Sequence, residues 1–170
     1  TSVSRGLGDV YKRQMLNIAF KDMKDVHIDN RETLKEGISF TIETLREYHS
    51  EYDNKQHFSL ILGNDAFASF KSWKNWGEIL NLSSLIVISR PNCDFLEGYL
   101  DEFKKNIVSS SSDFLSGHGK INFVETSMLD ISSSEIRKTI NNSDFNEDTL
   151  DGDVYAVSYT HLRAHETQRY

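Results

Sequence analysis

The sequence predicts an α/β fold with a parallel sheet. Three short, mostly apolar runs have the composition of strands, at residues 58–62, 84–88 and 121–125, and they alternate with stretches of helical periodicity. Near-continuous apolar strands are typical of a sheet that is covered on both faces. Polar residues of the kind that bind ligands follow directly after the strands, where open α/β sheets hold their ligands. Together these observations favour one α/β domain.

The two ends of the chain differ in origin from the rest. Residues 4–14 and 156–167 can be encoded by opposite strands of one oligonucleotide, and that DNA resembles a transposon-type sequencing adapter. We therefore expect residues 1–14 and 156–170 to be non-native, and residues 15–155 to be an internal fragment of a longer gene that holds a partial domain. Without these ends, 19 basic and 26 acidic residues become 14 and 24, a formal charge of −10.

Composition excludes several classes of protein. The acidic balance argues against a general nucleic-acid surface, which needs clustered Lys and Arg. Cys93 is the single cysteine, so an intrachain disulfide and a multi-cysteine metal centre are excluded. No apolar run approaches the length of a membrane span. We expect a soluble cytoplasmic protein without a nucleic-acid or membrane partner, and the sequence does not indicate its oligomeric state.

The segment before the first apolar run predicts two helices and a short strand. Residues 15–23 have the spacing of a helix end, and alternation predicts a strand at 26–29. A loop then leads into a helix over about 42–52, with Thr41 as its N-cap. Ser39 and Thr41 either only begin this helix or help to offer its N-terminus to a ligand carboxylate or phosphate.

The run at 58–62 ends in Gly63-Asn64-Asp65. At the end of such a strand a glycine lets a ligand approach the backbone, and an acid can bind a ribose hydroxyl. An Asp in this place can also simply cap the next helix. Gly63 and Asp65 are thus candidate nucleotide-binding residues.

Two tryptophans follow with different expected surroundings. Trp76, Ile79 and Leu80 have the i, i+3, i+4 spacing of a helix face that is turned to the core. Trp73 precedes this stretch between polar and basic residues, which predicts an aromatic ring near the surface that could stack on a flat ligand. The alternative is that Trp73 packs in the core.

The second apolar run ends at Ser89-Arg90-Pro91, and the proline stops the strand. An amphipathic helix is predicted over 95–107, and a loop rich in serine and glycine over 108–120. The third strand is predicted at 121–125.

Residues 131–137, Ile-Ser-Ser-Ser-Glu-Ile-Arg, predict a tightly specified helix start. Ser132 and Glu135 form an S-x-x-E capping box. The amides of such a first turn lie at the positive end of the helix dipole, and Arg137 adds a guanidinium one turn later, so a phosphate would be favoured there. The alternative is a well-capped surface helix.

Four motifs in this order resemble bacterial nicotinate-nucleotide adenylyltransferase. They are G-N-D-A-F at 63–67, W-x-x-W-x-x-I-L at 73–80, S-R-P at 89–91 and I-S-S-S-E-I-R at 131–137. Residues 39–45 are also similar to that family's S-[YF]-T-x-[DE]-T-L. The resemblance implies a Rossmann-like nucleotidyltransferase domain with a parallel sheet, which joins nicotinate mononucleotide to the AMP part of ATP, with Mg²⁺, and releases pyrophosphate.

The resemblance also implies roles for single residues. Ser132, Ser133 and Arg137 would hold the ATP phosphates, and Gly63 with Asp65 would contact the adenosine ribose.

On the substrate side, the resemblance implies that Trp73 stacks on the pyridine ring. Thr41 and its loop, which contains Ser39, would bind the carboxylate side of the mononucleotide. Alternatives within the superfamily are nicotinamide mononucleotide or phosphopantetheine as substrate, and an alternative of another class is a non-catalytic nucleotide-binding module.

The sequence departs from the family pattern in two places. Ser134 stands where the family usually has Thr, which retains the hydroxyl. The family's phosphate-binding segment with its H-x-G-H histidines is absent, and we expect it to belong upstream of Met15 with the first strand. This chain therefore has no predicted catalytic residue and no metal ligand of its own, and we expect it to be inactive and poorly stable as written.

Overall fold

The computed structural model describes residues 5–35, 37–52, 56–89, 98–125 and 152–158. The chain forms two compact units, one of residues 1–34 with 129–170 and the other of residues 35–128. The second unit contains the sheet. The boundaries predicted at residues 14 and 156 stay a prediction.

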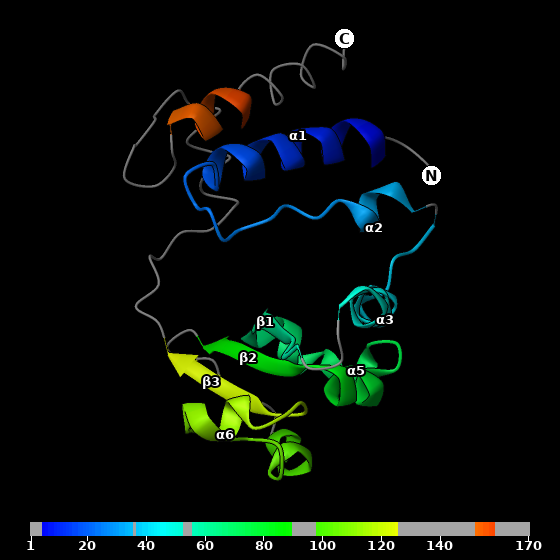
Figure 1. Ribbon diagram of the computed structural model, residues 1–170, viewed down its shortest axis with the longest axis vertical. Helices are drawn as coiled ribbons and strands as arrows, with labels where there is room; N and C mark the ends of the chain where they lie inside the picture. Colours follow the sequence, from blue (N-terminus) through cyan, green and yellow to red (C-terminus); the bar gives the residue numbers. More distant parts are fainter. Residues whose placement is uncertain (1–4, 36, 53–55, 90–97, 126–151, 159–170) are drawn as a thin grey trace. The chain divides into compact units, whose positions relative to one another are not determined.

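The sheet has three parallel strands in the order β1-β2-β3 (Figure 1). They are β1 (Ser59–Gly63), β2 (Ser84–Ser89) and β3 (Ile121–Glu125). Ser59 lies opposite Ser84, and Leu85 lies opposite Ile121. Each strand lies within one residue of its predicted bounds, so the prediction of an α/β fold with a parallel sheet is confirmed.

Short helices precede the first strand and connect the strands. In chain order they are α3 (Thr41–Glu51), α4 (Asn64–Ala68), the 3-10 helix η1 (Phe70–Ser72), α5 (Trp76–Leu82), the 3-10 helix η2 (Tyr99–Phe103) and α6 (Ser111–Leu115). α3 lies next to α5 (Figure 1). Arg46 of α3 joins the two helices through a bidentate ion pair with Glu78 of α5, with N–O distances of 2.8 and 2.6 Å.

Two predictions after β2 were wrong within the described residues. The helix predicted over 95–107 is only the 3-10 helix η2 in its described part, because Gly98 has a left-handed backbone and Ile107 forms an isolated parallel bridge with Ile121 of β3. The loop predicted over 108–120 contains the helix α6. Amphipathic spacing alone did not reveal that the end of the segment pairs with a strand.

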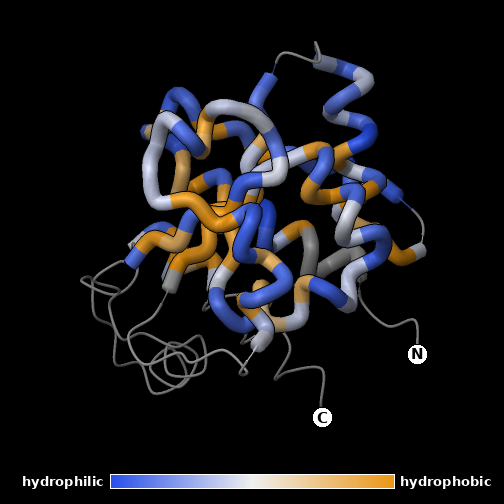
Figure 2. The backbone as a smooth tube through the Cα atoms, turned by 90° about the horizontal axis from the view of Figure 1, so that it is seen from below, coloured by the Kyte–Doolittle hydropathy of each residue, from blue (hydrophilic) through white to orange (hydrophobic). Residues whose placement is uncertain are grey.

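The core lies between the sheet and the helices. Its buried side chains are Ile42, Leu45, Phe67, Phe70, Ile79, Leu80, Leu85, Val87, Phe103 and Ile121. The rings of Phe67 and Phe103 lie 5.2 Å apart between centroids, and those of Phe67 and Phe70 lie 6.2 Å apart. Figure 2 shows the apolar segments of the chain in orange. Ile79 and Leu80 are buried as predicted, and Trp76 packs against the cluster.

β1 is covered on one face only within the described residues. Leu60 and Leu62 pack against the core cluster, whereas Ile61 between them is 65% exposed. The near-continuous apolar run predicted a strand covered on both faces. In the structure described, β1 is an end strand of the sheet.

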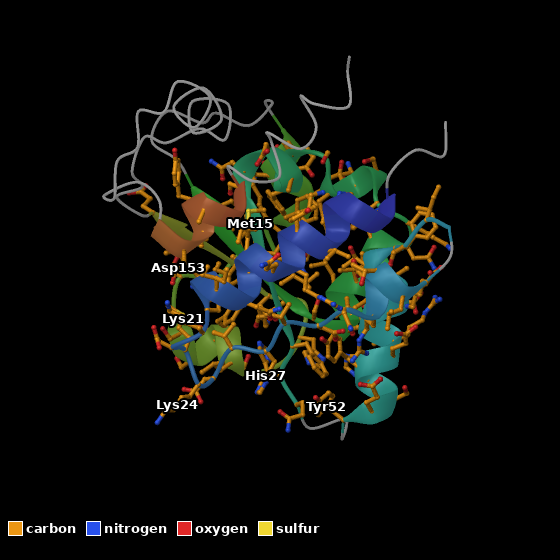
Figure 3. All side chains as sticks on the ribbon, turned by 90° about the horizontal axis from the view of Figure 1, so that it is seen from above. Met15, Lys21, Lys24, His27, Tyr52 and Asp153 are labelled. Carbon is orange, nitrogen blue, oxygen red and sulfur yellow. The ribbon has the colours of Figure 1, made fainter. Side chains whose placement is uncertain are left out.

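The regular secondary structure described in the unit of residues 1–34 and 129–170 is helical, and residues 20–30 form turns and irregular backbone. It contains α1 (Arg5–Ala19), α2 (Arg31–Leu34) and a helix at 152–158. Lys21 Nζ lies 2.9 Å from Asp153 Oδ2 (Figure 3).

The strand predicted at 26–29 is wrong. This segment has no strand hydrogen bonds, and the Asp29 carboxylate instead accepts the backbone N–H of Arg31 at the start of α2. In the described parts of the chain, no helix is both long and apolar enough to cross a membrane.

Three histidines gather at the end of the sheet where the strands begin. His49 lies 2.7 Å from the carbonyl oxygen of Leu82, and His118 lies 3.2 Å from that of Gln56. The His118 ring lies 5.5 Å from the ring of His49 and 5.4 Å from that of His57. Nε2 of His57 is buried and has no hydrogen-bond partner among the described residues. Burial, and secondly the nearby His118, lower the pKa of His57.

Replacement of His57 should make the stability less dependent on pH. Since the folded state disfavours protonated His57, the unfolded chain binds more protons below about pH 6.5, and the free energy of unfolding decreases as the pH falls through that value. His57→Gln removes this contribution. Urea unfolding at about pH 7.5 and about pH 5.5 should show a smaller decrease for the variant than for the wild type. Equal decreases would contradict the assignment.

Gly119→Ala should destabilise the turn before β3. Gly119 has φ +78°, and a Cβ there would lie 3.2 Å from the carbonyl oxygen of Leu80. We expect a loss of about 1–2 kcal/mol in the free energy of unfolding, measured with urea. Gly117→Ala is the matched control, because no atom lies within 4 Å of its Cβ position and its φ is not positive. The same loss in both variants would count against the backbone argument.

Candidate functional site

A pocket of about 250 Å³ opens between the start of α3 and the segment that joins η1 to α5. Its lining residues are Ser39, Phe40, Thr41, Ser72, Trp73, Lys74 and Ile79. Ser39, Thr41 and Trp73 are the three residues that the sequence analysis assigned to the substrate, and they come from two segments more than thirty residues apart. The structure therefore brings all three to one place.

The N-terminus of α3 forms one side of this pocket. Phe40 is the N-cap, with an extended backbone, and no side chain caps the helix. Thr41 was predicted as the N-cap, which was wrong by one residue, because Thr41 is already the first helical residue. The first amides of a helix have no acceptor within the helix and carry its positive dipole end. Without a side-chain cap, this end of α3 can bind an anionic group.

Ser39 adds an unsatisfied hydroxyl to the same place. Its Oγ is buried and has no hydrogen-bond partner in the described structure. A buried hydroxyl without a partner is unfavourable, so such groups call for an explanation. Ser39 lines the pocket, so a small movement of this residue would bring its hydroxyl to a polar group of a ligand there.

Trp73 forms the opposite side. Trp73 is the C-cap of η1, and its backbone N–H donates to the carbonyl oxygen of Phe70. The centroid of its ring lies 5.5 Å from that of the Phe70 ring. The indole is half-buried and packs against the core cluster while it also lines the pocket. The sequence is compatible with Trp73 either in the core or at the surface, and in the structure its ring contacts the core on one side and the pocket on the other.

Lys74 is the single charged residue among the described residues that line the pocket. Its Nζ lies 2.8 Å from Glu43 Oε1, in the first turn of α3, and 4.1 Å from the centroid of the Phe40 ring. The hydrogen bond from Lys74 and its charge hold the pKa of Glu43 below its ordinary value, which favours the ionised carboxylate. Lys74, Phe40 and Ser72 were not assigned from the sequence. The one sequence feature that could have indicated this site is that the basic residue Lys74 directly follows Trp73.

Gly63 and Asp65 lie together at the end of β1. Gly63 is the N-cap of α4, and Asp65 lies in its first turn. A Cβ on Gly63 would lie only 2.7 Å from Asp65 Oδ1, so the absent side chain leaves room for the carboxylate to turn back over the strand end. Both residues are exposed, and neither lines the pocket of Trp73.

The remaining predicted site residues, Ser132, Ser133 and Arg137, lie outside the described residues, so their phosphate-binding role stays a prediction. Among the residues that are described, no group of three or more His, Cys, Asp or Glu side chains is arranged to hold a metal ion.

Parallel strands joined through helices define an α/β domain, with Gly63 at the end of β1 and Asp65 in the first turn of α4, the place where open α/β sheets hold their ligands. The model of the cytidylyltransferase-like family matches residues 8–139, and the chain belongs to this family.

Two curated relatives of the chain carry the same name. The chain is 32% identical over 133 residues to the probable nicotinate-nucleotide adenylyltransferase of Hahella chejuensis, which covers 76% of this chain and 61% of the relative. It is 31% identical over 156 residues to the protein of that name from Pseudoalteromonas atlantica, covering 89% of this chain and 70% of the relative. The chain thus spans about three fifths of the first relative's length.

A solved structure shares the fold. It is the Plasmodium falciparum nicotinic acid mononucleotide adenylyltransferase complexed with APC, with a TM-score of 0.59 and 17% identity, and the match covers 90% of this chain and 74% of that chain. The fold class predicted from the sequence is confirmed by this match.

Replacement of Ser39 should separate a binding hydroxyl from a structural one. Ser39→Ala removes a buried oxygen without a partner, so the free energy of unfolding should stay constant or increase by up to about 1 kcal/mol. The control is Ser83→Ala, since buried Ser83 Oγ donates to the carbonyl oxygen of Ile79 at 2.8 Å, and its loss should cost about 1 kcal/mol. Urea unfolding measures both. A clear destabilisation by Ser39→Ala would show that this hydroxyl has a structural partner.

Proposed function

We propose that this site serves the transfer of the adenylyl group of ATP to nicotinate mononucleotide, which gives nicotinate adenine dinucleotide and pyrophosphate in NAD biosynthesis. The chain itself, which has no H-x-G-H segment, would bind the substrates without turning them over. The observation that carries this proposal is that Ser39, Thr41 and Trp73 line one pocket. The names of the curated relatives support the same reaction.

The pocket suits a flat ring that bears a carboxylate. The half-buried indole of Trp73 offers a face on which a pyridine ring can stack. The uncapped start of α3 and the buried Ser39 hydroxyl offer donors for the carboxylate. Its volume of about 250 Å³ is appropriate for the ring and its substituent, with the ribose phosphate outside.

The adenosine side of the proposal uses the end of β1. Asp65 would accept hydrogen bonds from the adenosine ribose, and Gly63 would allow close approach of the nucleotide. Ser132, Ser133 and Arg137 would hold the phosphates of ATP at the start of their helix.

The proposed reaction needs no protein nucleophile. A phosphate oxygen of the mononucleotide attacks the α-phosphorus of ATP in line, the new P–O bond forms, and the bond from the α-phosphorus to the bridging oxygen breaks to release pyrophosphate. The protein positions the two substrates and supplies positive charge. We propose that Mg²⁺ enters the site bound to ATP. It is usually held by one or two carboxylates and the substrate phosphates, so a cage of three protein ligands is not required. We also propose that the protein is located in the cytoplasm.

Trp73→Ala tests the proposed stacking. The variant should bind nicotinate mononucleotide more weakly by about 1–3 kcal/mol, as measured for stacked bases, whereas Trp73→Phe should retain part of the affinity. Isothermal titration calorimetry with the 170-residue chain measures binding without requiring turnover. An unchanged affinity of Trp73→Ala would place this ring in the core alone, and absence of any binding by the wild type would contradict the proposed substrate.

A further inference from the structure

We propose that Lys74 and Glu43 form a charge pair that sets the preference of the pocket for a ring carboxylate over a carboxamide. The inference rests on the proposed function, because it names the residues that select the substrate at the same pocket. It concerns the side chains at the rim, whereas the proposed function uses the backbone of α3, the Ser39 hydroxyl and the Trp73 ring.

The geometry places a cation at the pocket and holds it there. Lys74 lines the pocket directly after Trp73, and its partner Glu43 lies behind the lining residues in the first turn of α3. Nζ of Lys74 lies 2.8 Å from Glu43 Oε1 and 4.1 Å from the centre of the Phe40 ring. An ammonium has three N–H donors, so it can donate to Glu43 and to a ligand at the same time.

The ion pair of Lys74 and Glu43 is only partly shielded from water. The side chains of Lys74 and Glu43 are 44% and 36% exposed. The field of Lys74 in the pocket is therefore reduced, both by solvent and by the opposite charge of Glu43. Since Glu43 already orders the long side chain, less conformational entropy is lost when a ligand carboxylate arrives.

This arrangement gives the two residues opposite effects on selectivity. The Lys74 charge attracts a carboxylate and acts only weakly on a neutral carboxamide. The Glu43 charge repels a carboxylate and is likewise weak toward the carboxamide. If the pair only tied α3 to the segment after η1, removal of either partner would instead weaken both ligands to a similar extent.

The experiment compares two ligands that differ only in this group, nicotinate mononucleotide and nicotinamide mononucleotide. Dissociation constants are measured by calorimetry with the full 170-residue chain at low salt. Lys74→Met retains the length of the side chain and removes the charge, and Glu43→Gln retains the acceptor and removes the charge. Lys74→Arg is the matched control that restores a cation.

We expect Lys74→Met to lower the ratio of affinities, acid over amide, by about three- to tenfold. Glu43→Gln should raise the same ratio by about two- to threefold, and Lys74→Arg should recover most of the wild-type ratio. The wild-type ratio should also fall as salt is raised, since exposed charges are screened.

The outcomes separate this inference from the function on which it rests. If the wild type binds the acid but both charge-removing variants leave the ratio unchanged, the selectivity role is overturned and the proposed function stands. A parallel loss of both ligands in the two variants also overturns it, in favour of a merely structural tie. If the wild type binds neither mononucleotide, the proposed function is overturned, and the selectivity role that rests on it is overturned as well. Circular dichroism of each variant verifies that it is folded like the wild type.

Discussion

The aromatic packing beneath α4 and η1 is the constraint on which the described site depends. Phe67 and Phe70 are fully buried, on either side of the turn between the two helices, and both contact Phe103. α4 carries Asp65 at its start, and η1 ends at Trp73, whose ring packs on Phe70. One buried cluster therefore fixes the acid after β1 and the aromatic side of the pocket in a single piece of chain. Loss of volume at Phe67 or Phe70 would disturb both.

Much of the fold and part of the site could be predicted because their signals are local. The three strands are apolar runs of the right length, and Ile79 and Leu80 have a clear helical spacing. The rest depends on distant partners. The segment before residue 108 ends in a bridge to β3, and the Lys74 charge acquires its partner from a helix thirty residues earlier, which no local pattern contains.

The pocket combines features that cost stability in the free protein. A helix usually begins with a side-chain cap, yet α3 has none although Ser39 and Thr41 flank its N-cap Phe40. The Ser39 hydroxyl is buried without a partner. A natural sequence tolerates such local violations mainly where a ligand completes them. Their coincidence in one pocket is stronger support for binding there than either feature alone.

Net charge and local charge act in opposite directions in this protein. The chain carries a formal charge of −7, so its overall field disfavours anionic ligands such as ATP and nicotinate mononucleotide. Screening confines that overall field to about 10 Å at ordinary salt. Recognition of an anion must therefore come from donors within hydrogen-bond distance. In the proposed site the amides at the start of α3 would meet this requirement, and the cation that Glu43 holds beside Trp73 would add a second donor. Such a site would distinguish a carboxylate by contact rather than by long-range attraction, so its selectivity would depend on very few side chains.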